Sequence, residues 1–392
     1  MSYAEWTVSA QDFWVLRNVT WSPSGVCLLS GPNGAGKSSI LDVLKFLQIA
    51  ASRGLPEAVR LVGGGAPLQR LGAEPKAPVR LGLSIGDLSW EIQLPVESGS
   101  IHANHGEVIK HSGNVLARRA MYSTDVFLGK ERRDADERSI LQMLWDVHRP
   151  PALEPMIALA RGIRVYSSYA LDQIREPQGA IDTDAHLHTT GKNVSNVLRG
   201  WKSSPRRFRD QFGWVMNALR DAFPDLVVDL EFDQVGKTVI GRFYPPNAPT
   251  AEDSLPLSVA ADGLLVGILH LTAVAGAEEG SILAFDEIEN QLHPHAIRSI
   301  LAAMRAMAEE RDLTILLTTH SPIVMNAFKG HEDQFYVLEA GHEVLPIPLD
   351  KARDPDWLAH FSLGELYDRE DFAAPKRPAP LNAAECILRS GA

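Results

Sequence analysis

The chain has 392 residues, of which 45% are hydrophobic and 22% are charged. This balance is typical of a folded protein that can bury a substantial core, and the length suggests two or three lobes. The formal net charge of −11 argues against a protein whose whole surface binds nucleic acid, but it leaves room for a local basic face.

The cysteines and the apolar runs exclude further classes. Cys27 and Cys386 lack the spacing of a zinc site or a disulfide framework. The sequence contains no apolar run of about 18 residues, and its N-terminus lacks a basic and then apolar signal. We therefore expect a cytoplasmic protein without membrane contact.

The most specific motif lies near the N-terminus. Residues 13–19 and 26–30 have strand patterns, a glycine-rich turn follows, and residues 39–47 have a helical pattern. Strand, turn and helix in this order have the arrangement of a phosphate-binding loop, in which glycines let backbone N–H groups point at a phosphate. The candidate nucleotide-binding residues are Gly31, Pro32, Asn33, Gly34, Ala35, Gly36, Lys37, Ser38 and Ser39.

Two of these residues have side chains suited to a bound nucleotide. Lys37 is expected to reach the β- and γ-phosphates, and the Ser38 hydroxyl can bind Mg²⁺. The alternative is an ordinary glycine-rich turn. The strand before the turn and the helix after it favour the nucleotide site.

The chain divides into three predicted parts. Residues 1–95 form a first lobe with the phosphate-binding loop and paired strands at 79–94. Residues 96–225 look like an insertion with helical spacing at 140–145 and 212–219. No heptad run is sustained, so a compact helical lid is expected rather than a coiled-coil arm. Residues 226–392 form a second lobe that opens with a hairpin and ends in a tail.

Charged residues and histidines outside these motifs leave alternatives open. A mixed-sign run at 131–138 is most simply a solvated helix or loop. A basic cluster could contact phosphates or form a solvated helix face with internal salt bridges; its members are Arg199, Lys202, Arg206, Arg207 and Arg209. Four histidines could suggest a metal site, namely His186, His188, His293 and His295, but ordinary surface or core positions are favoured for His186, His188 and His295.

Two acids follow a buried strand in the second lobe. The apolar run at 281–285 ends in Asp286 and Glu287. A phosphate-binding-loop enzyme needs an acid on a neighbouring strand to hold Mg²⁺ through water, and Asp286 fits that role. Glu287 could orient or deprotonate the attacking water. Adjacent acids are also common at solvated loop starts, but the loop upstream favours a catalytic pair.

A third strand pattern at 313–319 ends at His320. A lone histidine in such a place is usually structural. Ligands of parallel sheets, however, sit at the carboxyl ends of strands. We therefore expect His320 to contact the γ-phosphate and to sense its presence.

Taken together, these motifs resemble ATP-binding-cassette (ABC) ATPases. Residues 287–294, Glu-Ile-Glu-Asn-Gln-Leu-His-Pro, are similar to the "DEPENGLHP" of the RecF/SMC-like branch, which includes OLD-family and other ATPase components of bacterial anti-phage systems. Residues 188–198 and 361–367 resemble the "DGxNLxxxL" and "SLGDLW" elements of the same branch. The resemblance implies an α/β fold, an ABC-type P-loop ATPase head with an inserted helical lid, and ATP with Mg²⁺ as cofactors.

The family signature shows one departure. Residues 257–265 resemble the "SDGT" signature, which implies that Asp262 and Gly263 bind the nucleotide held by the opposite subunit. Ala261 stands where the family has serine, so the hydroxyl contact is lost unless Ser258 replaces it. The Q-loop glutamine has no clear counterpart, although Gln69 and Gln93 are candidates.

The resemblance also implies partners. Heads of this kind close in pairs on ATP, so we expect a homodimer or higher oligomer and, with Ala261 in the signature, slow hydrolysis. Because only about seventy residues follow His320, we expect no fused nuclease domain. The leading hypothesis is an ATPase that senses a trigger and controls a separate effector protein, a nuclease, in anti-phage defence. The alternatives are a RecF-like clamp on DNA in repair and, less favoured, a transporter cassette.

Overall fold

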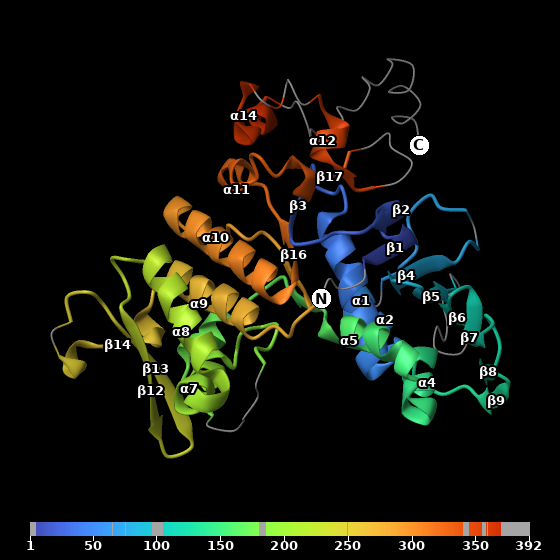
Figure 1. Ribbon diagram of the computed structural model, residues 1–392, viewed down its shortest axis with the longest axis horizontal. Helices are drawn as coiled ribbons and strands as arrows, with labels where there is room; N and C mark the ends of the chain where they lie inside the picture. The colour runs from blue at the N-terminus through green and yellow to red at the C-terminus, as the bar shows by residue number, and fades with distance from the viewer. Residues whose placement is uncertain are drawn as a thin grey trace, which may run out of the picture.

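The computed structural model describes residues 5–64, 66–74, 76–95, 105–179, 186–248, 250–339, 345–354, 358 and 360–369. Its architecture is α/β, with three sheets and the helices between and around them (Figure 1). Within this part of the chain, none of the helices has the length and apolar character needed to cross a membrane.

A large antiparallel sheet forms one side of the molecule. Its strand order is β2-β1-β4-β5-β6-β7-β8-β9. Buried and partly exposed side chains alternate along β5, as expected for a sheet with one face on a core. The bounds are β1 Trp6–Phe13, β2 Leu16–Trp21, β4 Val79–Ile85, β5 Leu88–Leu94, β6 Gly106–His111, β7 Asn114–Arg119, β8 Asp125–Leu128 and β9 Glu131–Asp134.

A mainly parallel sheet lies at the centre. Its order is β10-β15-β16-β3-β17-β18, and β18 alone in this order pairs antiparallel. The strands β15, β16 and β3 are buried at every position, the pattern of a sheet covered on both faces. The bounds are β10 Arg164–Tyr166, β15 Ile282–Phe285, β16 Thr314–Thr318, β3 Val26–Ser30, β17 Phe335–Val337 and β18 Ile347–Pro348.

Strand β3 separates two hydrophobic cores. Cys27 and Leu29 pack into the core that holds α1 and the antiparallel sheet, whereas Val26 and Leu28 pack into the core on the opposite face. Figure 1 shows α1 between the two sheets, with α8, α9 and α10 across the parallel sheet. The bounds of these helices are α1 Lys37–Arg53, α8 Pro205–Ala222, α9 Asp262–Ala275 and α10 Pro294–Arg311.

A small third sheet carries strands β11, β13 and β12, and β14 pairs with β13. These strands span Gln178–Gly179, Thr238–Tyr244, Asp229–Val235 and Leu255–Pro256 in that order. The remaining helices are α2 Leu55–Gly63, α4 Ile140–His148, α5 Glu154–Gly162, α6 Leu171–Arg175, α7 Val194–Ser203, α11 Pro322–Asn326, α12 Leu349–Ala352 and α14 Leu363–Asp368.

Several expected elements are present. The helical patterns at 140–145 and 212–219 lie in α4 and α8, and β12 and β13 form the expected hairpin around Gly236, which has φ 61°. The mixed-sign run at 131–138 is not a helix. It begins with β9, where Arg132 pairs with Asp125 of β8 at 2.8 Å.

The antiparallel sheet extends further along the chain than expected. Strands β6 to β9 pair in succession onto β5, although residues 96–225 looked mainly helical. These strands are short and partly polar, so their sequence pattern is weak. Residues 340–344 lie outside the described residues, as does the expected C-terminal tail from residue 370 on. The three-part division of the chain stays a prediction.

Candidate nucleotide site

The phosphate-binding loop lies between β3 and α1. Gly34 has φ 78° and Gly36 has φ 105°, a left-handed region that favours glycine. At Gly36 a side chain would also lack space, because a Cβ atom would lie 2.4 Å from Leu16 Cδ2. The tip of the β1–β2 hairpin thus packs against the loop and fixes the start of α1.

Lys37 is the first residue of α1, and its side chain folds back over the loop. Its Nζ donates hydrogen bonds to the carbonyl oxygens of Gly31 at 2.8 Å and Pro32 at 3.3 Å. Burial lowers the pKa of the Lys37 ammonium, and the nearby carboxylates of Asp286 and Glu287 oppose that shift. The cation is therefore held at the loop by neutral carbonyl groups.

Asp286 follows β15 and lies directly opposite the start of α1. Ser38 Oγ donates to Asp286 Oδ2 at 3.0 Å and lies 3.3 Å from Oδ1. From the neighbouring strand β16, the buried Thr318 hydroxyl donates to Oδ1. A serine hydroxyl beside a carboxylate is a pair of hard oxygen ligands, the kind that Mg²⁺ prefers, so these residues fit the predicted ion.

Glu287 occupies a strained backbone position at the same edge. Its φ is 50°, which is uncommon for a residue with a side chain, and its N–H donates to Thr318 Oγ1 at 2.8 Å. Asn290 Nδ2 donates to Glu287 Oε2 at 2.8 Å. The backbone turn and the amide together determine where the exposed carboxylate points.

A cavity of about 120 Å³ borders both acids. On its other side lie Ser167, Ser168 and Tyr169, which follow the edge strand β10. Because β10 pairs with β15, the segment after β10 lies at the same edge of the sheet as Asp286. Sequence reasoning missed the side chains of Ser167, Ser168, Asn290 and Thr318 as parts of this site.

His320 lies at the end of β16, partly buried. Its N–H donates to Glu289 Oε1 at 2.8 Å, and its Nδ1 lies 3.3 Å from the Tyr367 hydroxyl. Burial, followed by the positive charge of Lys37, lowers the pKa of the His320 imidazole, so the ring is neutral near pH 7. Tyr367 belongs to the 361–367 segment, which the fold therefore brings to the predicted sensor.

The signature residues lie at the start of α9. Ala261 precedes the helix without a side-chain cap, and Asp262 is its first residue; both are exposed. Arg175 of α6 donates to Asp262 Oδ1 and to the Ala260 carbonyl. A Cβ atom at Gly263 would lie 2.6 Å from the Gln291 carbonyl oxygen, so α9 begins against the loop that follows Glu287.

The two glutamine candidates lie elsewhere. Gln69 donates to the carbonyls of Glu74 and Ala77, and Gln93 lies on β5 beside Glu91. Both are in the antiparallel part of the molecule.

The remaining candidate residues have structural partners. His293 Nδ1 accepts from the His295 N–H at the start of α10, and His295 Nε2 contacts the Asp221 carbonyl at 2.9 Å. Among the described residues, no cluster of three or more His, Cys, Asp or Glu side chains could hold a metal ion. In the basic cluster, Arg199 donates to Gln234 and Lys202 to the Leu230 carbonyl. The side chains of residues 206, 207 and 209 lie outside the described part of the structure.

Comparison with known proteins gives a family, a relative and a set of solved structures. Residues 27–326 match the family described as "AAA domain, putative AbiEii toxin, Type IV TA system". The chain is 30% identical over 213 residues to the methionine import ATP-binding protein MetN 1 of Rhodococcus jostii, which covers 50% of this chain and 58% of that protein.

Solved structures of SMC head domains are similar over most of the chain. The head from Thermotoga maritima has 12% identity, a TM-score of 0.46, and coverage of 89% of this chain and 99% of that one. The Pyrococcus furiosus head, bound to the C-terminal domain of ScpA, has 11% identity, a TM-score of 0.48, and coverage of 90% and 98%. The family model spans well over half of the chain, so the chain belongs to this AAA-domain family, and this membership supports ATP binding and hydrolysis.

Proposed function

We propose that two copies of this chain close on ATP and that this closure controls a separate effector protein in anti-phage defence. The observation that carries the proposal is that the predicted nucleotide-binding residues lie in two places, one set together at the phosphate-binding loop and the other at the exposed start of α9. Lys37, Ser38, Asp286 and Glu287 converge within one chain. The start of α9 at Asp262 is instead exposed and has Arg175 of its own chain as a partner. An exposed helix start with free N–H groups suits a phosphate held by a second chain.

Each residue of the site has a proposed role. Ser38 and Asp286 hold Mg²⁺, which when bound would neutralise phosphate charge. Lys37 leaves its carbonyl partners for the β- and γ-phosphates. Glu287 accepts a proton from the attacking water, and the neutral His320 reports on the γ-phosphate. Asn290 fixes one oxygen of Glu287, so the other oxygen remains available to the water.

The link to defence rests on the family. Its description names a putative toxin of a type IV TA system. The similarity of residues 287–294 to ATPases of anti-phage systems also supports a role in defence. We further propose a cytoplasmic location, where ATP and Mg²⁺ are available.

The test is the mass of the assembly with its gene neighbours. The Glu287→Gln variant should retain ATP but not hydrolyse it, so light scattering should show a dimer that carries a neighbour-encoded protein only when ATP is present. Glu310→Gln, on the exposed end of α10, is the matched control and should behave like the unmodified protein.

Three outcomes would contradict the proposal. A monomer that binds ATP but does not associate refutes ATP-driven closure. Closure that requires added DNA favours the RecF-like clamp. Co-purification of a membrane permease favours a transporter cassette, for which the likeness to an import ATP-binding protein is the supporting observation.

A further inference from the structure

A large groove lies beside the nucleotide site, and none of the roles above uses it. It has a volume of about 600 Å³ and runs from the second half of α1 to the segment after β10. We call it the α1 groove. Its lining residues are Lys45, Gln48, Ile49, Arg53, Leu61, Ile163, Arg164, Val165, Ser167, Ser168, His186, Leu187, His188, Thr189, Thr190 and Lys192.

The described residues that line the α1 groove carry a charge opposite in sign to that of the whole protein. Lys45, Arg53, Arg164 and Lys192 line it, and none of its lining residues within the described structure is acidic. The chain as a whole carries −11. The Arg164 guanidinium is held at the groove by hydrogen bonds to the carbonyls of Arg161 and Ile163, at 2.5 and 2.9 Å. A concave surface lined by one sign of charge concentrates ligands of the opposite sign.

The groove has the size and chemistry of a small-ligand site. Its volume lies within the range of about 300–1,000 Å³ that is usual for such sites. Lys45 and Arg53 are eight positions apart on α1, which separates them by about 12 Å along the helix axis. Cations spread in this way suit an anion with several separated charges. The hydroxyl groups of Thr189 and Thr190 add hydrogen-bonding capacity, and Ile49 and Val165 add apolar surface.

One wall of the α1 groove is shared with the hydrolytic site. Ser167 and Ser168 line both the groove and the 120 Å³ cavity that borders Asp286 and Glu287. Both serines are exposed and directly follow the strand that pairs with β15. A molecule in the groove therefore contacts the segment that also faces the catalytic acids.

We propose that the α1 groove binds a short phosphodiester-linked nucleotide segment, two to three nucleotides long, and that its occupant changes the rate of ATP hydrolysis through Ser167 and Ser168. The second half of this proposal rests on the roles proposed for Asp286 and Glu287. The source of the segment is either a free oligonucleotide or part of a longer single strand.

Binding is tested with two fluorescent probes, the dinucleotide pApA and single-stranded dA12. The host is the full chain with Lys37→Ala, so that the phosphate-binding loop does not contribute. We expect saturable binding that weakens as salt rises. The double substitution Arg53→Ala with Lys192→Ala should raise the Kd about tenfold or more, because each lost phosphate contact removes counterion release.

The control is Lys351→Ala, an exposed lysine on α12 at the far end of the molecule (Figure 1), which should leave the Kd unchanged. Binding of pApA identifies a free oligonucleotide as a sufficient ligand, and binding of dA12 alone identifies a strand. If neither probe binds, or if the control weakens binding as much as the double substitution, the site does not exist.

The coupling is tested in the unmodified protein. Saturating probe should change ATP turnover, and the Arg53→Ala, Lys192→Ala protein should show no change at the same probe concentration. Binding without any effect on turnover overturns the coupling. The ATP-driven association above is measured without probe, so its failure and the failure of this site are distinguished.

Discussion

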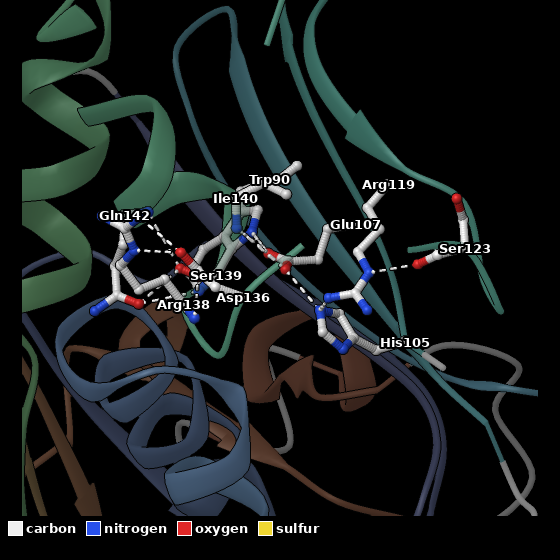
Figure 2. Close-up of polar contacts among 10 residues, drawn as sticks. All are labelled: Trp90, His105, Glu107, Arg119, Ser123, Asp136, Arg138, Ser139, Ile140 and Gln142. Carbon is white, nitrogen blue, oxygen red and sulfur yellow. Dashed lines mark hydrogen bonds and ion pairs between the residues drawn. The ribbon is translucent and has the colours of Figure 1, made fainter. Parts of the chain in front are cut away.

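Two carboxylate centres in this molecule differ in their hydrogen-bond partners and in their exposure to solvent. Glu107 of β6 is fully buried, and Figure 2 shows the polar groups converging on it. Trp90 Nε1 lies 3.0 Å from its Oε2, His105 Nε2 lies 3.1 Å from its Oε1, and the Ile140 N–H lies 3.2 Å from both oxygens. The Ile140 N–H begins α4, so Glu107 ties that helix to the sheet.

Asp286 has a different set of partners. They are the hydroxyls of Ser38 and Thr318, and Ser38 is exposed. A hydroxyl can donate to a carboxylate or turn a lone pair towards a cation, whereas an indole or a backbone N–H can only donate. Carboxylates with fixed donors hold the fold together. Those that face rotatable hydroxyls near solvent keep the capacity to bind a ligand.

The largest effect is expected from a substitution in the partly exposed site that contains Asp286 and Glu287. The Glu287→Gln substitution removes the proposed base and leaves the carbonyl oxygen that Asn290 contacts. ATP turnover should fall by about a hundred- to ten-thousand-fold, the usual contribution of a general base. Steady-state phosphate release measures turnover, and a fluorescent ATP analogue should bind as before. A loss of binding equal to the loss of turnover would show that Glu287 supports the nucleotide rather than the chemistry.

The next largest effect is expected from a substitution at the buried carboxylate of Glu107. The Glu107→Ala substitution leaves the Trp90 N–H and the start of α4 without an acceptor in a buried place. The free energy of unfolding should fall by about 3 kcal/mol, because buried donors lose their partner. Urea denaturation measures this change. Glu131→Ala, at an exposed pair on β9, should cost less than about 0.5 kcal/mol. Equal losses of unfolding free energy in the two variants would contradict the structural role assigned to the buried Glu107.

A smaller effect is expected when Asn290, which positions the Glu287 carboxylate, is replaced. The Asn290→Ala substitution should lower kcat about tenfold with little change in the KM for ATP, since a positioning hydrogen bond is lost. The Asn290→Asp substitution places a second negative charge beside Glu287. The repulsion between the two carboxylates should displace Glu287 and lower kcat at least as much as Asn290→Ala does. An unchanged kcat in both variants would leave Asn290 with a purely structural role.

The smallest effect concerns a buried base behind the same cavity. His270 packs between Tyr169, at 5.5 Å between ring centroids, and Phe285, at 5.0 Å. Burial lowers the pKa of His270 to about 3. Between that value and the ordinary value near 6.5, the unfolded chain binds the proton and the folded chain does not, so stability falls as pH falls.

Replacing this imidazole removes the effect. In His270→Leu the fall in unfolding free energy between pH 6 and pH 4 should be shallower by about 1 kcal/mol per pH unit. Urea denaturation at several pH values measures the slope. His331→Leu, at an exposed turn position, is the control and should keep the original slope. An identical slope in the unmodified and His270→Leu proteins would mean that His270 is protonated in the core.

The sequence was informative where chemistry requires consecutive residues. One parallel sheet carries three strands that are followed by the glycine-rich loop, by the Asp286–Glu287 pair and by His320. The fold class and the convergence of these residues were therefore predictable. The contacts from distant segments were not. Thr318 to Asp286, Tyr367 to His320 and Arg175 to Asp262 depend on strand register and helix packing, which one-dimensional periodicity does not contain.

The middle of the chain shows the same limit. Strands β6 to β9 are short, and their polar residues are paired across strands, as Arg132 is with Asp125. Such strands gain stability from their neighbours rather than from their own pattern. The Glu107 centre was equally hidden, because His105, Trp90 and Ile140 meet it only after the sheet has formed.

The hydrogen bonds of the folded-back Lys37 side chain limit which anions can bind at the loop. Its ammonium already has two carbonyl acceptors, so a ligand must offer more than those contacts to draw it away. A singly charged anion that approaches alone gains little from the exchange. A polyphosphate gains from the lysine, the loop N–H groups and the helix start together. The resting loop thus discriminates among anions before any catalytic group takes part.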